Sequence, residues 1–134
     1  MLIRIAVPDD IEMLTRYDHH VDRQELENII RLKRIYIAED HGEFIGWLRY
    51  SLFWDSIPFM NMLYLLEDGR GKGYGMQLVR FWEEHMKKSD YKIVMTSTQS
   101  NEYAQHFYDR LGYLAIGGFR LNNDPFELIL SKSI

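Results

Sequence analysis

The sequence predicts an α/β fold in which a mixed, mostly antiparallel central sheet carries helices on both faces. Segments rich in β-branched and aromatic residues alternate along the chain with segments of helical periodicity. The almost wholly apolar run Phe59–Leu66 is typical of a central strand that is buried on both faces. Closely spaced glycines follow this strand and lead into a helical pattern, at the end of the strand where such sheets bind ligands.

The first half of the chain predicts a strand, two helices and a hairpin. Its elements are, in order, a short N-terminal strand, helices over residues 11–17 and 22–33, and strands over residues 35–39 and 43–54. The turn at residues 8–10 supplies a proline and a cap before the first helix. Leu26, Ile29 and Ile30 share one side of the second helix, and the turn at residues 40–42 joins the two strands.

The second half predicts a central strand, two helices and three further strands. Its elements are a loop over residues 55–58, a strand over residues 59–66, helices over residues 75–88 and 101–111, and strands over residues 91–98, 113–121 and 126–130. Apolar residues recur at helical spacing from Gly75 to Met86. Ser100 or Asn101 caps the helix over residues 101–111, and Gly112 is placed to end it.

Composition limits the size and the partners of the protein. The chain has 134 residues, of which 46% are hydrophobic, so we predict a single domain over residues 1–134. A net charge of −4 favours neither nucleic acid nor a membrane as partner, and the basic stripe is confined to Arg31, Lys33 and Arg34. Cysteine is absent and no signal peptide or membrane-spanning run is evident, so we predict a cytoplasmic protein. The histidines lack metal-ligand spacing, and no metal site is predicted.

The run Arg70–Gly75 is a local candidate for anion binding in a chain whose net charge is negative. Glycines at positions 71, 73 and 75 allow positive φ angles and a close approach of backbone to ligand. The helix that follows presents unpaired N–H groups and the positive end of its dipole. Arg70 and Lys72 add positive charge beside them. The run therefore predicts a pyrophosphate cradle, and a tight strand-to-helix turn without a ligand is the alternative.

Two other phosphate-binding motifs fail on specific residues. The dinucleotide fingerprint GxGxxG requires a glycine at position 76, where this chain has Met76. The P-loop requires a serine or threonine after Gly71-Lys72, and Gly73 stands there instead. Neither motif explains the run.

Two segments of the chain resemble the GCN5-related N-acetyltransferase (GNAT) superfamily. The first is Leu63–Leu66 followed by R-x-x-G-x-G at residues 70–75 and an amphipathic helix. The second, Asn101–Tyr113, is similar to the N-x-x-A-x-x-F-Y-x-x-x-G-F/Y segment of that family. The two segments occur in the family's order and cover roughly residues 59–113, so we expect a GNAT-like fold with acetyl-CoA as co-substrate.

The resemblance implies which residues hold the cofactor. The two parallel strands at residues 59–66 and 91–98 would splay apart, and the backbone of Leu65 and Leu66 would pair with the pantetheine arm. Asn101 and Tyr108 would face the cofactor from the other side. The residues implied to hold the pyrophosphate are Arg70, Gly71, Lys72, Gly73, Tyr74, Gly75 and Met76.

Acetyl transfer to an amine requires an oxyanion donor, an acid for the thiolate and a deprotonated amine. A backbone N–H at Leu65 would meet the oxyanion, because a splayed strand leaves donors unpaired. Tyr108 matches the family's acid, although a packed core tyrosine would have the same sequence pattern. The central strand has no carboxylate, so Asn61 is assigned to position a water. The more distant groups that could act through this water are Asp55, Glu67, His19 and His20.

The acceptor is expected to enter near four aromatic residues, Tyr50, Phe53, Trp54 and Phe59, which could also be ordinary core residues. The leading hypothesis is an N-acetyltransferase that moves the acetyl group of acetyl-CoA to a primary amine of a small molecule or protein, by direct attack in a ternary complex. The alternative is a non-catalytic acyl-CoA-binding or sensing domain. A homodimer is compatible with either hypothesis.

Overall fold

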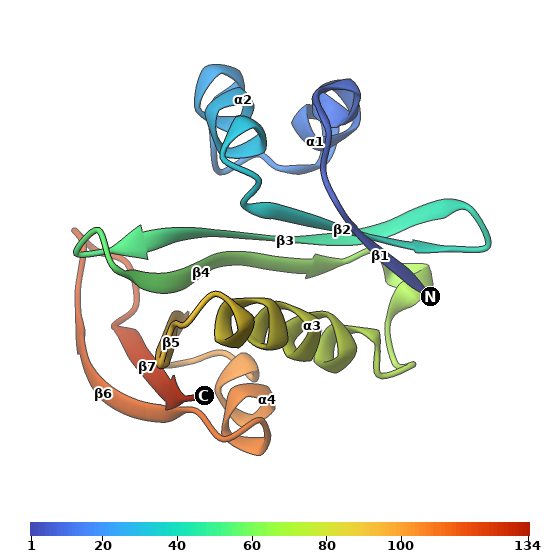
Figure 1. Cartoon of the computed structure of the whole chain (residues 1–134). Helices are drawn as coiled ribbons and strands as arrows, with labels where there is room; N and C mark the ends of the chain where they lie inside the picture. Colours follow the sequence, from blue (N-terminus) through green and yellow to red (C-terminus); the bar gives the residue numbers. More distant parts are fainter. The chain divides into compact units, whose positions relative to one another are not determined.

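The computed structural model describes residues 1–134, and its elements follow the predicted order β-α-α-β-β-β-α-β-α-β-β (Figure 1). The strands are β1 (Leu2–Ile5), β2 (Ile35–Asp40), β3 (Glu43–Phe53), β4 (Ile57–Leu65), β5 (Ile93–Gln99), β6 (Leu114–Phe119) and β7 (Glu127–Ser133). The helices are α1 (Ile11–Tyr17), α2 (Arg23–Arg31), α3 (Tyr74–Lys88) and α4 (Ala104–Arg110), with short 3-10 turns η1 (Pro8–Asp10) and η2 (Glu67–Gly69).

The strands form a seven-stranded sheet in the order β1-β2-β3-β4-β5-β7-β6, so β4 is central as predicted. Strand β4 is parallel to β5, whereas the pairs β1–β2, β2–β3, β5–β7 and β6–β7 are antiparallel. The predicted mixed, mostly antiparallel α/β fold is confirmed. The parallel register joins Phe59 to Met95 and Met60 to Thr96.

The chain forms two compact units. Unit 1 comprises Met1–Ser51 and Met62–Val79, and unit 2 comprises Leu52–Asn61 and Arg80–Ile134. Strands β3 and β4 and helix α3 contribute to both.

In unit 1, α1 and α2 pack on β2 and β3 (Figure 1). The shared core consists of Ala6, Leu14, Leu26, Ile30, Ile35, Ile37 and Trp47. Helix α2 begins at the cap Asp22, whose carboxylate accepts a hydrogen bond from the backbone N–H of Glu25 at 2.8 Å. It ends at Arg31, two residues earlier than predicted, because Lys33 has the left-handed φ of 61°.

The hairpin between β3 and β4 is tighter than the sequence suggests. Trp54 and Asp55 have φ values of 52° and 64°, and the N–H of Ser56 donates to the carbonyl of Phe53 at 3.2 Å, which is a two-residue type I′ turn. Strand β4 therefore begins at Ile57, within the predicted loop. The strand is not buried on both faces, because Asn61 remains exposed in its middle.

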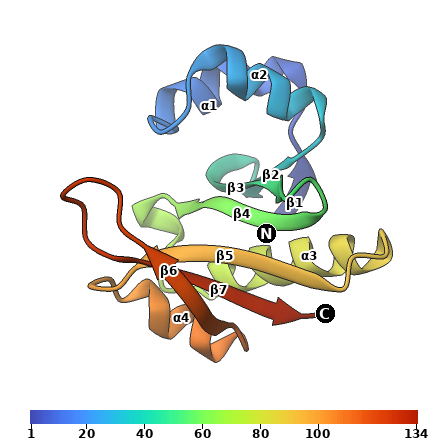
Figure 2. The ribbon, with the colours of Figure 1, turned by 90° about the vertical axis from the view of Figure 1, so that its left-hand side faces the viewer.

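In unit 2, β5 pairs with β7 along its whole length and α4 packs beside this pair (Figure 2). Helix α4 begins at Ala104, not at residue 101, because Gln105 turns back to hydrogen-bond the carbonyls of Ser100 and Glu102. Gly112, with a φ of 94°, ends it as predicted. No helix of the chain is long and apolar enough to cross a membrane.

Candidate active site

The predicted cradle lies in unit 1, between the end of β4 and the start of α3. Gly71 and Gly73 have φ values of 75° and 77°, which an L side chain adopts only at a cost. A Cβ added at either glycine would meet no atom within 4 Å, so open space lies beside the backbone. Gly75 differs from the expectation: it lies in the first turn of α3 and has helical backbone.

The start of α3 leaves backbone donors free beside these glycines. The carbonyl of Gly73 accepts the N–H of Gln77 at 3.1 Å, which is the first hydrogen bond of the helix. The N–H groups of Tyr74, Gly75 and Met76 therefore precede the helical ladder and point out of its positive end. With exposed Lys72 beside them, they form an anion-binding geometry.

The end of β4 presents one unpaired edge in unit 1. The N–H of Leu66 donates to the carbonyl of Ile45 in β3 at 2.8 Å. Because successive N–H groups of a strand point to opposite edges, the N–H of Leu65 faces away from β3. The carbonyl of Leu65 accepts Nε of Arg70 at 2.9 Å, and the guanidinium of Arg70 lies 5.1 Å from the ring centroid of Tyr64. Arg70 thus lies at the strand end.

Two residues that support this region were missed by the sequence analysis. A Cβ at Gly46 would collide with the Tyr64 carbonyl and the Leu65 side chain, so only glycine lets β3 approach the end of β4 so closely. Asp40 accepts a hydrogen bond from the Tyr74 hydroxyl at 3.1 Å, and this bond raises the pKa of Tyr74. Neither residue belongs to a motif, and only the folded chain brings them to the cradle.

Tyr108 lies on α4 in unit 2 with 7% of its surface exposed. Burial raises its pKa to about 12, and a hydrogen bond with Thr96 acts in the opposite direction. The hydroxyl of Thr96 donates to the carbonyl of Met60 at 2.9 Å, at the parallel pairing of β4 with β5. Tyr108 is therefore both a packed tyrosine and a protonated acid at neutral pH.

A second hydroxyl on β5 has no protein partner. Thr98 is 5% exposed and its Oγ1 makes no hydrogen bond. It lies on the same face of β5 as Thr96, two residues nearer the carboxyl end of the strand. Such a group costs about 1–3 kcal/mol unless a ligand satisfies it. Asn101 is exposed in the turn that precedes α4.

The structure assigns no general base. Asn61 is exposed on β4, and Asp55 is exposed in the adjacent hairpin turn of the same unit. The remaining candidates, Glu67, His19 and His20, are exposed in unit 1. No group of three or more His, Asp or Glu side chains is placed to hold a metal ion.

Three of the four aromatic residues predicted for the acceptor cluster in unit 2. The ring of Phe53 lies 4.8 Å from that of Trp54 and 6.0 Å from that of Phe59. Trp54 is 79% exposed and sits on the left-handed turn residue where asparagine or glycine is usual. Tyr50 belongs to unit 1, where its ring stacks on Tyr36.

A buried ion pair in unit 1 was not predicted. Asp18, 2% exposed, accepts Nε of Arg49 at 2.6 Å and Nε1 of Trp47 at 3.1 Å. The ring of Trp47 lies 5.3 Å from that of Tyr64 and 5.9 Å from that of Phe44. The ion pair thereby fixes the segment after α1 against an aromatic group on β3 and β4.

A strand with a free edge, two left-handed glycines and an open helix N-terminus are features that favour anion binding at the strand-to-helix turns of α/β proteins. The family model described as acetyltransferase (GNAT) family matches residues 2–113. This chain therefore belongs to the GNAT family, whose members are acyltransferases.

Solved structures agree on the fold. Ard1 from Thermoplasma volcanium has a TM-score of 0.85 at 15% identity, covering 99% of this chain and 97% of that one. The ribosomal-protein-alanine N-acetyltransferase from Brucella melitensis has a TM-score of 0.80 at 18% identity, covering 100% of both chains. An aminoglycoside 6'-N-acetyltransferase complexed with coenzyme A has a TM-score of 0.81 at 16% identity, covering 99% and 97%. No curated protein matches the sequence.

Proposed function

We propose that this protein is an acetyl-CoA-dependent N-acetyltransferase that transfers the acetyl group to a primary amine in a ternary complex. The observation that carries the proposal is the pair Gly71 and Gly73, which are left-handed and open beside the N-terminus of α3. The β2–β3 turn at Gly42 has the same left-handed backbone and open space, so the position of Gly71 and Gly73 at the start of α3, beside the exposed Lys72, is what favours a ligand here. Family membership supplies the acyl transfer itself.

Coenzyme A fits the residues of the cradle. Its pyrophosphate meets the N–H groups of Tyr74, Gly75 and Met76 and the backbone of Gly71 and Gly73. Arg70 and Lys72 supply cations, and Arg70 then gives up the carbonyl of Leu65. The freed carbonyl of Leu65 pairs with an amide group of the pantetheine arm. Leu66 was predicted to pair with the arm as well, but its N–H donates to Ile45 and its carbonyl accepts from Gly69, so its backbone is already paired. Asn101, which is exposed in the turn before α4, is proposed as a further contact of the cofactor.

In the proposed reaction the amine nitrogen attacks the thioester carbonyl, the C–N bond forms and the C–S bond breaks. The N–H of Leu65, which faces away from β3, stabilises the oxyanion. Tyr108 keeps its proton at neutral pH and gives it to the departing thiolate. A water held by Asn61 takes the proton of the amine, because β4 contains no carboxylate.

The acceptor is proposed to enter over Phe53, Trp54 and Phe59. An exposed tryptophan offers a flat apolar face that binds an ammonium by cation–π attraction or an apolar side chain by burial. Tyr50, which stacks on Tyr36 in unit 1, was also predicted to contact the acceptor. This contact of Tyr50 with the acceptor stays a proposal.

The test is a steady-state assay of free thiol with acetyl-CoA and a panel of amines. The panel contains peptides with an N-terminal alanine, an aminoglycoside and simple alkylamines, which cover the acceptor classes named for the structural neighbours. We expect thiol release that depends on one class of amine, with a mass increase of one acetyl group on that amine. The proposal would be contradicted if thiol were released from acetyl-CoA without any amine and if this release persisted in the variant Tyr108→Phe.

A second candidate is a non-catalytic acyl-CoA-binding or sensing domain. The observations that favour it are the lack of a carboxylate on β4 and the burial of Tyr108. It predicts calorimetric binding of acetyl-CoA without turnover on any amine. We further propose that residues 1–134 act as one acetyltransferase domain in the cytoplasm, with neither nucleic acid nor a membrane as partner. A homodimer is compatible with this proposal.

A further inference from the structure

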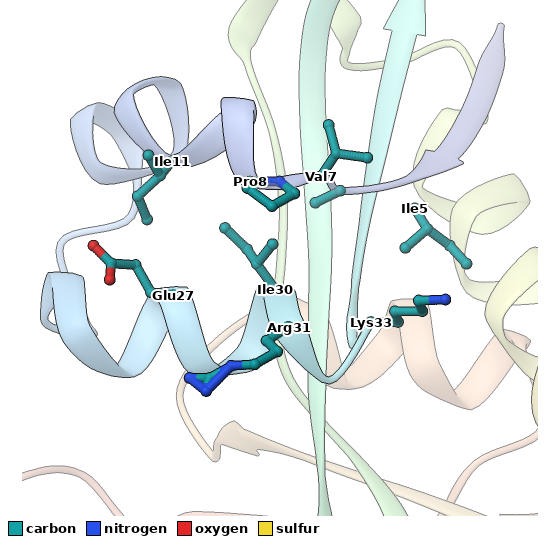
Figure 3. Close-up of a pocket in the computed structure, with 9 residues that line it drawn as sticks. Ile5, Val7, Pro8, Ile11, Glu27, Ile30, Arg31 and Lys33 are labelled. Carbon is teal, nitrogen blue, oxygen red and sulfur yellow. The ribbon is translucent and has the colours of Figure 1, made fainter.

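The two ends of β2 contact different parts of unit 1. The carbonyl of Ile35, at the start of the strand, accepts the N–H of Ala6 at 2.9 Å. Ala6 lines a cavity of about 860 Å³ between α2 and the segment that follows β1 (Figure 3). Asp40, at the end of the strand, accepts the hydroxyl of Tyr74 at 3.1 Å. The end of β2 at Asp40 is therefore the end that contacts the cradle.

The bond between Asp40 and Tyr74 ties the cradle to a strand that does not lead into it. Tyr74 is the first residue of α3, which follows β4, and β3 lies between β4 and β2 in the sheet. The N–H groups of Tyr74, Gly75 and Met76 are the free donors at the start of this helix. A hydrogen bond from the Tyr74 side chain to β2 therefore fixes the direction of these donors relative to the sheet.

The ring of Tyr74 also contacts a cation of the cradle. The ammonium of Lys72 lies 6.0 Å from the centroid of this ring, at the outer limit of cation–π attraction. Lys72 is exposed and stands between the left-handed residues Gly71 and Gly73. Contacts thus run from Asp40 through Tyr74 to the Lys72 ammonium, which lies beside the free N–H groups.

Asp40 differs from its neighbour on β2 in having no short ion pair. Glu39 binds Nε of Arg4 at 3.0 Å. Asp40 comes no closer than 3.9 Å to a basic side-chain nitrogen, which is Nε2 of the exposed His41. By its charge alone, a carboxylate near an anion site opposes anion binding. The hydrogen bond to Tyr74 is therefore the contact that accounts for an acid at this position.

We propose that Asp40 is a positioning residue of the coenzyme A site and acts through Tyr74. The inference rests on the proposed function, because it requires that the cradle hold the pyrophosphate of coenzyme A. The bond from Asp40 keeps Tyr74 in the orientation that points the first N–H groups of α3 and the Lys72 ammonium at one anion. Loss of this bond weakens coenzyme A binding, although a negative charge is removed at the same time. Charge alone would predict the opposite change in affinity.

The test is calorimetry of coenzyme A binding to wild type and three variants. Asp40→Ala removes the hydrogen bond and the charge, and coenzyme A is expected to bind about threefold to tenfold more weakly. Asp40→Asn keeps an oxygen that accepts the Tyr74 hydroxyl and removes only the charge, so it should bind coenzyme A at least as tightly as wild type. Glu39→Ala, the matched control, breaks the pair with Arg4 and should leave the affinity unchanged.

A double-mutant cycle separates positioning through Tyr74 from a general loss of stability. Tyr74→Phe breaks the same hydrogen bond from its other side, so Asp40→Ala with Tyr74→Phe should bind coenzyme A no more weakly than the weaker single variant. Carbon-13 NMR of labelled tyrosine gives a direct signature of the bond. The pKa of Tyr74, which the bond raises, should fall toward its usual value of about 10 in Asp40→Ala.

The outcomes distinguish this inference from the proposed function. If wild type binds coenzyme A, the inference alone is overturned by unchanged or tighter binding in Asp40→Ala. It is also overturned by an equal loss of affinity in Glu39→Ala or Asp40→Asn, or by additive losses in the double variant. If wild type does not bind coenzyme A, the proposed function fails and the inference fails with it.

Discussion

Tyr108 and Tyr113 form a matched pair of buried tyrosines, with rings 5.6 Å apart, that separates catalysis from packing. Tyr108→Phe removes only a hydroxyl and is expected to lower kcat about a hundredfold or more, because the thiolate loses its acid. Tyr113→Phe removes the hydroxyl that donates to Glu83 at 2.7 Å, so it should cost about 1–3 kcal/mol of stability and leave kcat near wild type. The measurements are kcat and the free energy of unfolding in urea for both variants. An equal loss of kcat in Tyr108→Phe and Tyr113→Phe would show that the Tyr108 hydroxyl acts only in packing.

Thr98 is the residue whose substitution distinguishes a ligand-facing hydroxyl from a defect of the core. Thr98→Val removes an unsatisfied buried hydroxyl, so the free protein is expected to gain about 1 kcal/mol. If the hydroxyl serves the cofactor, calorimetry should show weaker binding of coenzyme A in the same variant. Thr96→Val is the control, because it breaks the bond to the Met60 carbonyl and should destabilise the free protein. A stabilised Thr98→Val with wild-type affinity would exclude the cofactor role.

At the scale of elements, the cradle depends on backbone conformation more than on side chains. Gly73→Val is expected to weaken coenzyme A binding about tenfold or more, because a side chain fills the open space beside the left-handed backbone. Gly42→Val is the control, since Gly42 has a φ of 80° in the β2–β3 turn and also faces open space. Both variants should lose similar stability, and calorimetry should show the affinity loss in Gly73→Val alone. Equal coenzyme A affinities of the two variants would show that Gly73 does not contact the cofactor.

Sequence periodicity predicted the order and type of the elements, whereas the structure changed their ends. Helix α2 ends two residues before the predicted end at Lys33, and α3 begins at Tyr74, one residue before the predicted start, because helix ends depend on single φ values that no pattern encodes. The motif from Arg70 to Gly75 located the cradle because its chemistry is local. Asp40 and Gly46 reach the same region only through the pairing of strands distant in sequence, so no local signal could reveal them.

At the scale of the whole molecule, the buried pair Asp18–Arg49 links pH to stability. Burial alone would raise the pKa of Asp18, but the hydrogen bonds and charge of Arg49, with the N–H groups of His20 and Trp47, lower it overall. A carboxylate whose folded pKa lies below its unfolded value of about 3.9 stabilises the fold above that value. This stabilisation is lost as the pH falls through the folded pKa.

The corresponding experiment is urea unfolding of wild type and Asp18→Asn between pH 7 and pH 3. At pH 7, Asp18→Asn leaves Arg49 buried without its counter-charge and should cost about 3–5 kcal/mol. The difference between the two proteins should shrink as the pH falls below about 3.9, because Asp18 of unfolded wild type then takes up a proton while the folded protein, with its lower pKa, still holds the carboxylate charged. The pKa of Asp10 is also lowered, by Arg4, but that pair is present in both proteins and cancels in the difference. A difference that stays constant from pH 7 to pH 3 would show that Asp18 does not carry this dependence.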